Sequence, residues 1–416
     1  MKELFKQIIL EKQDWIKRLK LVSREIEIES AANYVFTGLR RAGKSYFLYQ
    51  IALQKISKNK IQEILMINFE DERLVELTHM DLQLILEAYR EMFSVQPMIF
   101  LDEIQNVPQW QKFVRRLADE GMRVYITGSN AEMLSHEIAS VLGGRFINKE
   151  ILPLSFSEFL NFQGIAHSDQ SKYNNERFAI KKAYELYLRF GAFPELIQLD
   201  NKREFLSNVY QKLFYGDLIS RYKISNPQIL KLLLKKLAES VNNETSVNRI
   251  KNLIKSTGIS IGNNTLFDYL SYLEFSFMIA SISNYYSKFV EKENIKKYYF
   301  LDTGILGLFL VNQDSKLLEN QVYIELRRRG YQVYFLKRNT EVDFYIPEYQ
   351  LLIQVSYSLK EKETYDREVK GLEKAMKEFN IDNGMVITYD ESDEIKSAHG
   401  IIKVIPAWIW LLEKNN

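Results

Sequence analysis

The sequence predicts an α/β fold in which a mainly parallel sheet, covered by helices on both faces, forms the first part of the chain. Two observations predict it. A glycine-containing loop at residues 38–45 joins an apolar segment to a helical one, and further apolar segments alternate with helices after it. Uninterrupted apolar strands separated by helices are typical of parallel sheets buried on both faces. The expected strands are residues 33–37, 64–69, 97–102, 122–128 and 146–152, and residues 1–32 are expected to form an amphipathic helix before them.

The composition limits the function classes. At 416 residues the chain has room for about two to four domains. Its 56 lysines and arginines nearly balance 54 aspartates and glutamates, so overall charge does not favour a nucleic-acid partner. The absence of cysteine excludes disulfides, thiolate metal sites and a cysteine nucleophile. No apolar run of about 18 residues occurs, so we expect no membrane partner and a cytoplasmic location.

The loop at residues 38–45 matches GxxxxGK[ST] at every fixed position, after a strand and before a helix. Backbone N–H groups in such a loop, with the positive end of the next helix, form a nest for phosphate oxygens. Lys44 is expected to reach the β and γ phosphates, and Ser45 to ligate Mg²⁺. The alternative is a strand-to-helix turn with a chance Lys-Ser pair. The residues expected to contact a nucleoside triphosphate are Gly38, Leu39, Arg40, Arg41, Ala42, Gly43, Lys44, Ser45 and Tyr46.

A second motif supplies the acids that hydrolysis requires. The apolar run at 98–101 leads into Asp102 and Glu103. At the carboxyl end of a strand, Asp102 would hold the Mg²⁺ shell and Glu103 would act as general base toward the attacking water. The alternative is a buried strand that ends in solvated acids.

Further polar residues are candidates for the same site. Ser129 and Asn130 follow the strand expected between the loop strand and the Asp102 strand, and either could contact the γ-phosphate or water. Gly-Ser-Asn is also ordinary turn chemistry. Arg145, after two glycines, is the candidate for a charge that stabilises the transition state, in cis or in trans. Action in trans would require a nucleotide-dependent homo-oligomer, whereas a surface arginine is the alternative.

The rest of the chain predicts three further segments. Residues 153–225 have helical periodicity and suggest a helical subdomain beside the nucleotide. Residues 226–300 suggest a winged helix, with helices at 230–240, 247–255 and 265–275 and a hairpin from 277–283 and 296–301. Residues 301–416 alternate short strands with helices at 320–329 and 363–379. The expected domains are therefore 1–152, 153–225, 226–300 and 301–416.

DNA binding by the winged-helix segment has limited support. No lysine or arginine lies between Asn263 and Asn284, although such residues usually supply phosphate contacts. The second helix carries cations at Arg249, Lys251 and Lys255 that could touch the DNA backbone, and packing is the alternative role. The basic residues at 327–329 and 337–338 form a better local patch, or a solvated helix end.

Several motifs together resemble the prokaryotic AAA-type ATPases that carry a C-terminal restriction-endonuclease-like domain. They are the loop at 38–45, Ile67-Asn68-Phe69-Glu70-Asp71, Leu101-Asp102-Glu103-Ile104-Gln105, Thr127-Gly128-Ser129-Asn130, Pro153-Leu154-Ser155-Phe156-Ser157-Glu158-Phe159 and Lys297-Tyr298-Tyr299-Phe300-Leu301-Asp302-Thr303-Gly304. The resemblance spans nearly the whole chain. It implies ATP with Mg²⁺ as ligand and an additional-strand P-loop NTPase core, but no known biological task.

The same resemblance implies a PD-(D/E)xK nuclease-like last domain. Such nucleases use a helix glutamate, an aspartate at a strand start, and an acid and a lysine two residues apart on the next strand. Glu319 or Glu325 and then Asp343 fit the first two roles, but Gln354 and Ser356 stand in place of the acid and lysine. An amide is a poor divalent-metal ligand and serine supplies no amine. We therefore expect a degenerate nuclease fold, unless Lys360 or Lys362 has taken the lysine's role.

The sequence thus favours an Mg-dependent ATPase whose nucleotide cycle moves the winged-helix and nuclease-like domains. Two alternatives remain: a nucleotide-dependent DNA- or protein-binding switch with negligible turnover, and an ATP-gated DNA nuclease.

Overall fold

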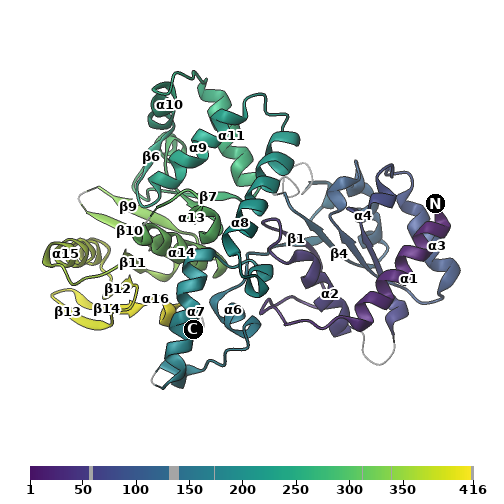
Figure 1. The fold of residues 1–416 in the computed structure, drawn as a ribbon, viewed down its shortest axis with the longest axis horizontal. Helices are drawn as coiled ribbons and strands as arrows, with labels where there is room; N and C mark the ends of the chain where they lie inside the picture. Colours follow the sequence, from purple (N-terminus) through teal and green to yellow (C-terminus); the bar gives the residue numbers. More distant parts are fainter. Residues whose placement is uncertain (56–59, 131–139, 173, 312, 339, 414–416) are drawn as a thin grey trace. The chain divides into compact units, whose positions relative to one another are not determined.

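The computed structural model describes residues 1–55, 60–130, 140–172, 174–311, 313–338 and 340–413. Its internal contacts divide the chain into two compact units, and each is described by itself. The first comprises Met1–Leu152 with the short segment Phe275–Phe277. The second comprises Pro153–Glu274 and Met278–Asn416. Figure 1 shows the elements of both units.

The first unit is built on a five-stranded parallel sheet with the order β2-β3-β4-β1-β5. Strand β4 therefore lies between β1, which leads into the phosphate loop, and β3, which ends in the predicted acids. This order confirms the predicted parallel α/β core and the strand expected between the two motifs. The strands are β1 Asn33–Thr37, β2 Ile64–Asn68, β3 Met98–Asp102, β4 Arg123–Gly128 and β5 Phe146–Glu150.

Helices cover both faces of this sheet, as alternating side chains in the strands require. Within β1, Val35 belongs to a core cluster with α1 Lys2–Arg18, α3 Leu82–Met92 and α4 Trp110–Asp119. Its neighbours Tyr34 and Phe36 point to the other face, where they pack against α2 Lys44–Lys55. The sheet with its helices is visible on the right of Figure 1.

The predicted helix over residues 1–32 is wrong in its second half, because α1 ends at Arg18. Residues 19–32 contain no helix. The apolar residues of this stretch alternate with charged ones, as in Glu25-Ile26-Glu27-Ile28-Glu29, and this period of two suits an extended chain. Leu19, Leu21, Ile26 and Ile28 accordingly pack along the α2 side of the sheet.

The second unit begins with helices. They are α6 Phe156–Phe162, α7 Glu176–Phe190 and α8 Lys202–Gln211, which continues into a π-helix at Lys212–Ser220. Next come α9 Pro227–Ser240, α10 Val247–Lys255 and α11 Asn263–Phe275, with an antiparallel sheet of β6 Thr245–Ser246, β8 Ile295–Phe300 and β7 Ile279–Ser283. All three helices and the hairpin expected between residues 226 and 301 are present. The short helix α12 Phe289–Asn294, inside the hairpin, was not expected.

The chain then forms a mixed six-stranded sheet with the order β13-β14-β12-β11-β10-β9. Helix α15 Lys362–Phe379 covers one face through Val369, Leu372 and Met376. Strand β13 lies at one edge of this sheet and is rich in charged residues. The elements are α13 Thr303–Gly307, α14 Asp314–Arg328, β9 Tyr334–Lys337, β10 Glu341–Ile346, β11 Leu351–Ser356, β12 Asn383–Thr388, β13 Asp393–Ser397, β14 Gly400–Pro406 and α16 Ala407–Trp410.

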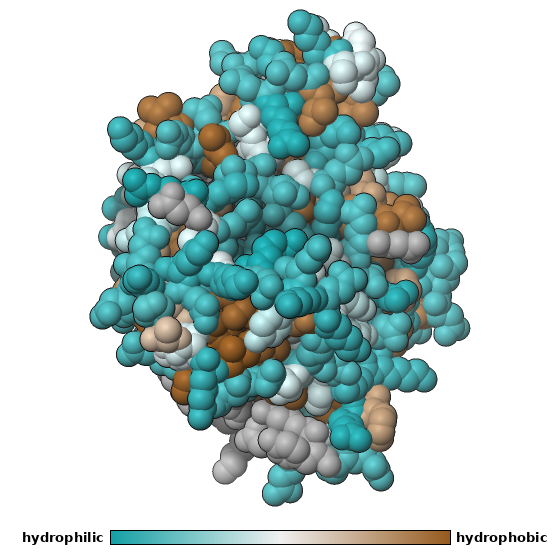
Figure 2. Space-filling model, turned by 90° about the vertical axis from the view of Figure 1, so that its left-hand side faces the viewer, coloured by the Kyte–Doolittle hydropathy of each residue, from teal (hydrophilic) through white to brown (hydrophobic). Residues whose placement is uncertain are grey.

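No helix among the described residues is long and apolar enough to cross a membrane. Figure 2 shows hydrophilic residues over most of one face, with scattered apolar areas between them.

A buried aspartate joins two helices of the second unit. Asp302 accepts hydrogen bonds from the backbone N–H of Ile305 at 3.0 Å and of Ala192 at 2.9 Å. The first bond caps α13, and the second holds the turn after α7. The fit is close, since a Cβ added to Gly191 would lie 2.3 Å from the Asp302 carboxylate oxygens, and one added to Gly304 would lie 2.2 Å from the carbonyl oxygen of Phe190.

Stability should depend on pH through Asp302. Burial raises the pKa of Asp302 to about 6, although its backbone hydrogen bonds oppose the shift. Because the folded pKa is raised, the contribution of this group is greatest below about pH 4 and is lost as pH rises through about 6, a change of about 3 kcal/mol. We predict that the free energy of unfolding of the wild type, measured relative to that of Asp302→Asn, falls by this amount between about pH 4 and 7. Denaturant unfolding of both proteins measures it, and a difference independent of pH would contradict the prediction.

Candidate functional site

The phosphate loop is positioned by a close backbone approach at Gly38. The N–H of Ile151 donates to the carbonyl oxygen of Thr37 at 2.7 Å, just before the loop begins. Gly38 has φ of 142°, and a Cβ there would lie 2.2 Å from the carbonyl oxygen of Ile151. Glycine is therefore required at this position. Gly43, with φ of 95°, makes the second turn into α2.

The loop delivers its lysine to the inside of the turn. Lys44 is the first residue of α2 and is buried, and its Nζ donates to the carbonyl oxygens of Gly38 at 3.0 Å and Leu39 at 3.1 Å. Ser45 is half-buried beside it, whereas Tyr46 is exposed and faces the ring of Trp15. The N-terminus of α2 also presents backbone N–H groups and a partial positive charge toward an anion.

The other nucleotide-contact candidates lie around the loop. Ala42 donates its N–H to the carbonyl oxygen of Leu39, which closes the turn. The guanidinium of Arg40 pairs with Glu70 at 2.7 Å, and Arg41 is exposed with φ of 63°. From the sequence, the two arginines are expected to be solvated or bound to a neighbouring domain rather than catalytic; Arg40 instead pairs with Glu70 of its own unit.

The predicted acids are joined to β4 by one hydroxyl group. The hydroxyl of Thr127 donates to Oδ1 of Asp102 at 2.5 Å and accepts the backbone N–H of Glu103 at 2.9 Å. Glu103 has left-handed backbone geometry, with φ of 52°, which turns its side chain away from the direction of the strand. Its Oε2 accepts a hydrogen bond from the amide of Gln105 at 2.5 Å. The structure therefore brings Asp102 and Glu103 together at the carboxyl end of β3.

Three buried polar atoms at this edge have no hydrogen-bond partner among the described residues: Thr37 Oγ1, Asp102 Oδ2 and Ser129 Oγ. They lie at the carboxyl ends of β1, β3 and β4, which adjoin in the sheet. Buried polar groups normally have partners, so unsatisfied ones at one edge suggest a ligand that would satisfy them. Oxygen donors from one carboxylate and from hydroxyl groups suit Mg²⁺ held jointly with phosphates.

Asp102 is electrostatically prepared for a cation. Burial raises the pKa of Asp102 to about 6, and the charge of Glu103 adds to the shift, while Thr127, Ser45 and Lys44 oppose it. A bound divalent cation would favour the ionised form. Asp102 and Ser45 thus lie close enough to act on each other, as a shared metal ligand pair requires.

Asn130 is buried and lies two residues beyond the end of β4, at the same edge as Asp102. It is also the last described residue before the gap at 131–139. The structure therefore places it with the loop edge of the sheet, where the sequence placed it.

Arg145, in contrast, is not brought to the phosphate loop. It immediately precedes β5, whose first residue pairs with Asn33 at the start of β1. The loop follows the other end of β1, and a five-residue strand is about 17 Å long. Arg145 pairs with Asp119, and its Nη1 donates to the carbonyl oxygen of Gly143 at 3.2 Å. The predicted role of Arg145 at the phosphate loop of its own chain is therefore wrong. Only the role in trans remains as a proposal.

Arg24, which was not predicted as a site residue, contacts the loop from the side of residues 19–32. Its buried guanidinium donates to the carbonyl oxygen of Ala42 at 2.8 Å and to that of Leu152 at 2.9 Å. The Gln50 side chain on α2 fixes the Arg24 backbone through two hydrogen bonds, of 2.7 and 3.0 Å. Arg24 is a positioning residue for the loop. Because Arg24 is charged and precedes a stretch of alternating glutamates, this role could not be predicted from the sequence.

The nuclease-like candidates are only partly assembled. Glu319 and Asp343 both contact the ammonium of Lys297, at 3.4 and 3.0 Å. Glu325 instead pairs with Arg328 and Arg329.

Gln354 and Ser356, which stand in place of the acid and lysine of that motif, form hydrogen bonds with other groups. Gln354 accepts the backbone N–H of Asp343 and donates to Glu368, an acid that the sequence reasoning missed. Ser356 donates to the carbonyl oxygen of Ser358. Lys360 and Lys362 are exposed, so the lysine that reaches the acids is Lys297, on the preceding sheet.

The expected basic patch at 327–329 is largely internal. Arg328 donates to the carbonyl oxygens of Pro153 at 2.9 Å and Leu154 at 3.2 Å. Arg329 donates to the carbonyl oxygen of Trp410 and stacks on its ring. Lys337 pairs with Glu244 and Glu341. These charges are compensated, which removes most of the expected patch.

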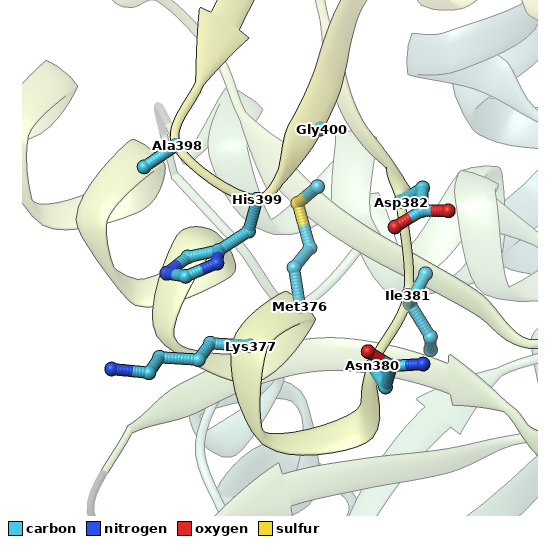
Figure 3. Close-up of a pocket in the computed structure, with 8 residues that line it drawn as sticks. All are labelled: Met376, Lys377, Asn380, Ile381, Asp382, Ala398, His399 and Gly400. Carbon is cyan, nitrogen blue, oxygen red and sulfur yellow. The ribbon is translucent and has the colours of Figure 1, made fainter.

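A pocket of about 390 Å³ lies in the second unit, between the end of α15 and the turn before β14 (Figure 3). In the figure, Lys377 and His399 lie on one side of it and Asp382 on the other. A single carboxylate with a lysine and a histidine on separate elements forms no catalytic arrangement. The phosphate loop therefore remains the candidate active site.

Comparison with curated proteins agrees with this geometry. The chain is 37% identical to the "Uncharacterized protein MJ1544" of Methanocaldococcus jannaschii over 431 residues, which cover 99% of this chain and 96% of that protein. The chain is a member of the MJ1544 family. An "Uncharacterized protein" of Haemophilus influenzae is 32% identical over 82% of this chain and 88% of its own length.

Within this MJ1544-family chain, residues 31–160 match a family model described as an AAA domain. Residues 181–316 match a model described as a domain of unknown function, DUF8612. The match and the strand order show an AAA-type P-loop NTPase core, the fold of nucleotide-binding proteins.

Solved structures give weaker similarity. A Walker-type ATPase of Pyrococcus abyssi is 13% identical, with a TM-score of 0.45, over 75% of this chain and 96% of that one. AMPPCP-bound DnaA of Aquifex aeolicus is 12% identical, with a TM-score of 0.25, over 65% of this chain and 86% of that one. Scores at this level add no argument, so the assignment rests on the family match and on the loop geometry.

Nucleotide binding should be lost when Gly38 gains a side chain. We predict that Gly38→Ala lowers the affinity for Mg·ATP by up to about 100-fold, since positive φ and the clash with Ile151 together store strain of about 3 kcal/mol. Gly121→Ala is the matched control, because Gly121 also has positive φ, of 76°, but its Cβ would meet nothing within 4 Å. Titration with a fluorescent nucleotide measures both. Equal affinities for the two variants would show that the close approach is unimportant.

Proposed function

We propose that this protein binds ATP with Mg²⁺ at the phosphate loop, hydrolyses it, and uses the nucleotide cycle to alter the second unit. One observation carries the proposal. The buried edge of the sheet gathers Lys44, the Thr127-linked acids and three unsatisfied oxygen atoms, and these are the groups that a metal-bound triphosphate would satisfy.

Each residue has a distinct role in this proposal. Lys44 and the loop N–H groups bind and orient the phosphates. Ser45 and Asp102 hold Mg²⁺, which when bound supplies positive charge for the phosphate oxygens. Glu103 accepts a proton from the attacking water, and Asn130 orients that water or the γ-phosphate.

Two arginines support coupling between the nucleotide and the rest of the chain. Arg24 holds the carbonyl oxygens of Ala42 in the loop and of Leu152, the last residue of the first unit. The next two carbonyl oxygens, those of Pro153 and Leu154, accept hydrogen bonds from Arg328 on α14. Contacts to the γ-phosphate order loops that relax after hydrolysis. The short stretch 152–154 is the route by which such a change would leave the first unit.

A slow-turnover switch is the second candidate function, and one observation favours it. Gln105 donates to the Glu103 carboxylate at 2.5 Å, a hydrogen bond that stabilises the ionised carboxylate and makes it a weaker base toward water. Such a switch would act on a protein partner rather than on DNA. The residues exposed on α11 include Asn263, Phe267 and Asp268 but no cation, whereas DNA binding draws on phosphate contacts.

We also propose that the six-stranded domain has a nuclease-like fold without cleavage activity, and that residues 226–300 form a winged-helix module used for packing. The support is the neutral Gln354 and Ser356 and the buried, paired state of Glu319 and Asp343. Plasmid DNA incubated with this protein and Mg²⁺ or Mn²⁺, with and without ATP, should stay intact.

Hydrolysis is tested by two substitutions with matched controls. We predict that Glu103→Gln lowers ATP turnover about 100-fold or more while binding is retained, because the general base is lost. Lys44→Ala should weaken binding and turnover together. Glu72→Gln and Lys112→Ala, which change exposed residues of the same unit, should leave both unchanged. Phosphate release and nucleotide titration provide the two measurements. Wild-type turnover that persists in Glu103→Gln and Lys44→Ala would sink the proposal.

A further inference from the structure

A lysine lies buried between two carboxylates of the second unit, far in sequence from the phosphate loop. Lys297 is on β8, Glu319 on α14 and Asp343 on β10. The side chains of the three residues are 1%, 3% and 8% exposed. The lysine Nζ is 3.0 Å from Asp343 Oδ1 and 3.4 Å from Glu319 Oε1. An ammonium group therefore occupies the point where the two carboxylates converge.

Two further hydrogen bonds hold the carboxylates of the cluster. Tyr299 donates its hydroxyl to Glu319 Oε1 at 2.8 Å, and the N–H of Val355 donates to Asp343 Oδ2 at 3.0 Å. The oxygen-rich surroundings are those that a hard divalent cation would use. Among the described residues, however, no third acid or histidine joins such a set. Two carboxylates and one ammonium thus lie in direct contact, and the buried carboxylate of Glu368 is linked to Asp343 through Gln354.

Charge balance explains why a cation must be present. An isolated buried carboxylate is strongly unfavourable, and the two together repel each other. Burial alone lowers the pKa of Lys297, but Glu319 and Asp343 outweigh it and raise the pKa above its ordinary value. The lysine therefore stays charged inside the domain, tethered by its own backbone.

We propose that the Lys297 ammonium is a built-in replacement for a divalent cation, which occupies the point between Glu319 and Asp343 and keeps metal ions out of the six-stranded domain. Because β8 is the central strand of the three-stranded sheet, the same contact ties that sheet to the six-stranded one. This inference is independent of ATP hydrolysis. It makes the domain's fold independent of metal ions.

The test compares metal binding in full-length variants without nucleotide, with MnCl₂ as the probe. Lys297→Met should gain one Mn²⁺ site per chain, seen by electron paramagnetic resonance titration up to about 1 mM, and Mn²⁺ should raise its melting temperature. Both effects should vanish in Lys297→Met/Asp343→Asn. The control Lys296→Met alters the neighbouring lysine, which pairs with Glu293, and should bind Mn²⁺ as wild type does. Any Mn²⁺ bound at Asp102 is common to all variants.

Two results would overturn the proposal. One is a Mn²⁺ site in the wild type that Asp343→Asn removes, because the lysine would then fail to exclude metal. The other is folded Lys297→Met that gains no site. If Lys297→Met is insoluble, it is refolded with and without MnCl₂. Recovery only with Mn²⁺ supports the proposal, whereas no recovery with Mn²⁺, alongside a soluble Lys297→Met/Glu319→Gln/Asp343→Asn protein, contradicts it.

Discussion

The hydroxyl of Thr127 is the contact on which the candidate site depends. It donates to Asp102 and accepts the N–H of Glu103, so one group on β4 sets the position of both acids. This is geometrically feasible only because β4 lies between β1 and β3, which places β4 beside both the loop strand and the acid strand. The order of strands therefore determines the chemistry. Gly38 serves the same end, since its lack of a side chain lets the loop lie against Ile151.

Buried charges organise the second unit in a comparable way. Asp302 joins the end of α7 to α13, Arg328 holds the carbonyl oxygens where the unit begins, and Lys297 joins two sheets. Each charge has partners on elements that are distant in sequence. Leaving one partner of such a pair buried without the other is strongly destabilising. These residues therefore specify how the helices and sheets of this unit pack.

The features that could be predicted from the sequence were those set by residues close together in the chain. Apolar runs such as 98–101 identified the strands, and the loop motif with the Asp102-Glu103 pair identified the site edge, because each signal lies within a few residues. The first helix was predicted to end at residue 32 instead of Arg18, because the alternation of charged and apolar residues at 25–29 was not taken as a sign of extended chain. The placement of Arg145 depends on how β5 pairs with β1 in the sheet. The burial of Lys297 depends on Glu319, 22 residues away, and that of Arg328 on the carbonyl oxygen of Pro153, 175 residues away. Patterns along the chain do not contain that information, and charge alone favoured an exposed position.

The account is tested most directly by single-turnover release of γ-phosphate from Mg·ATP by wild type and Thr127→Val. Valine preserves the shape of threonine but removes the hydroxyl that positions both acids. If the site works as proposed, the rate falls about 100-fold while the affinity for ATP changes little, because the loop and Lys44 are untouched. An unchanged rate in Thr127→Val, or no phosphate release by the wild type above the uncatalysed rate, would contradict the account.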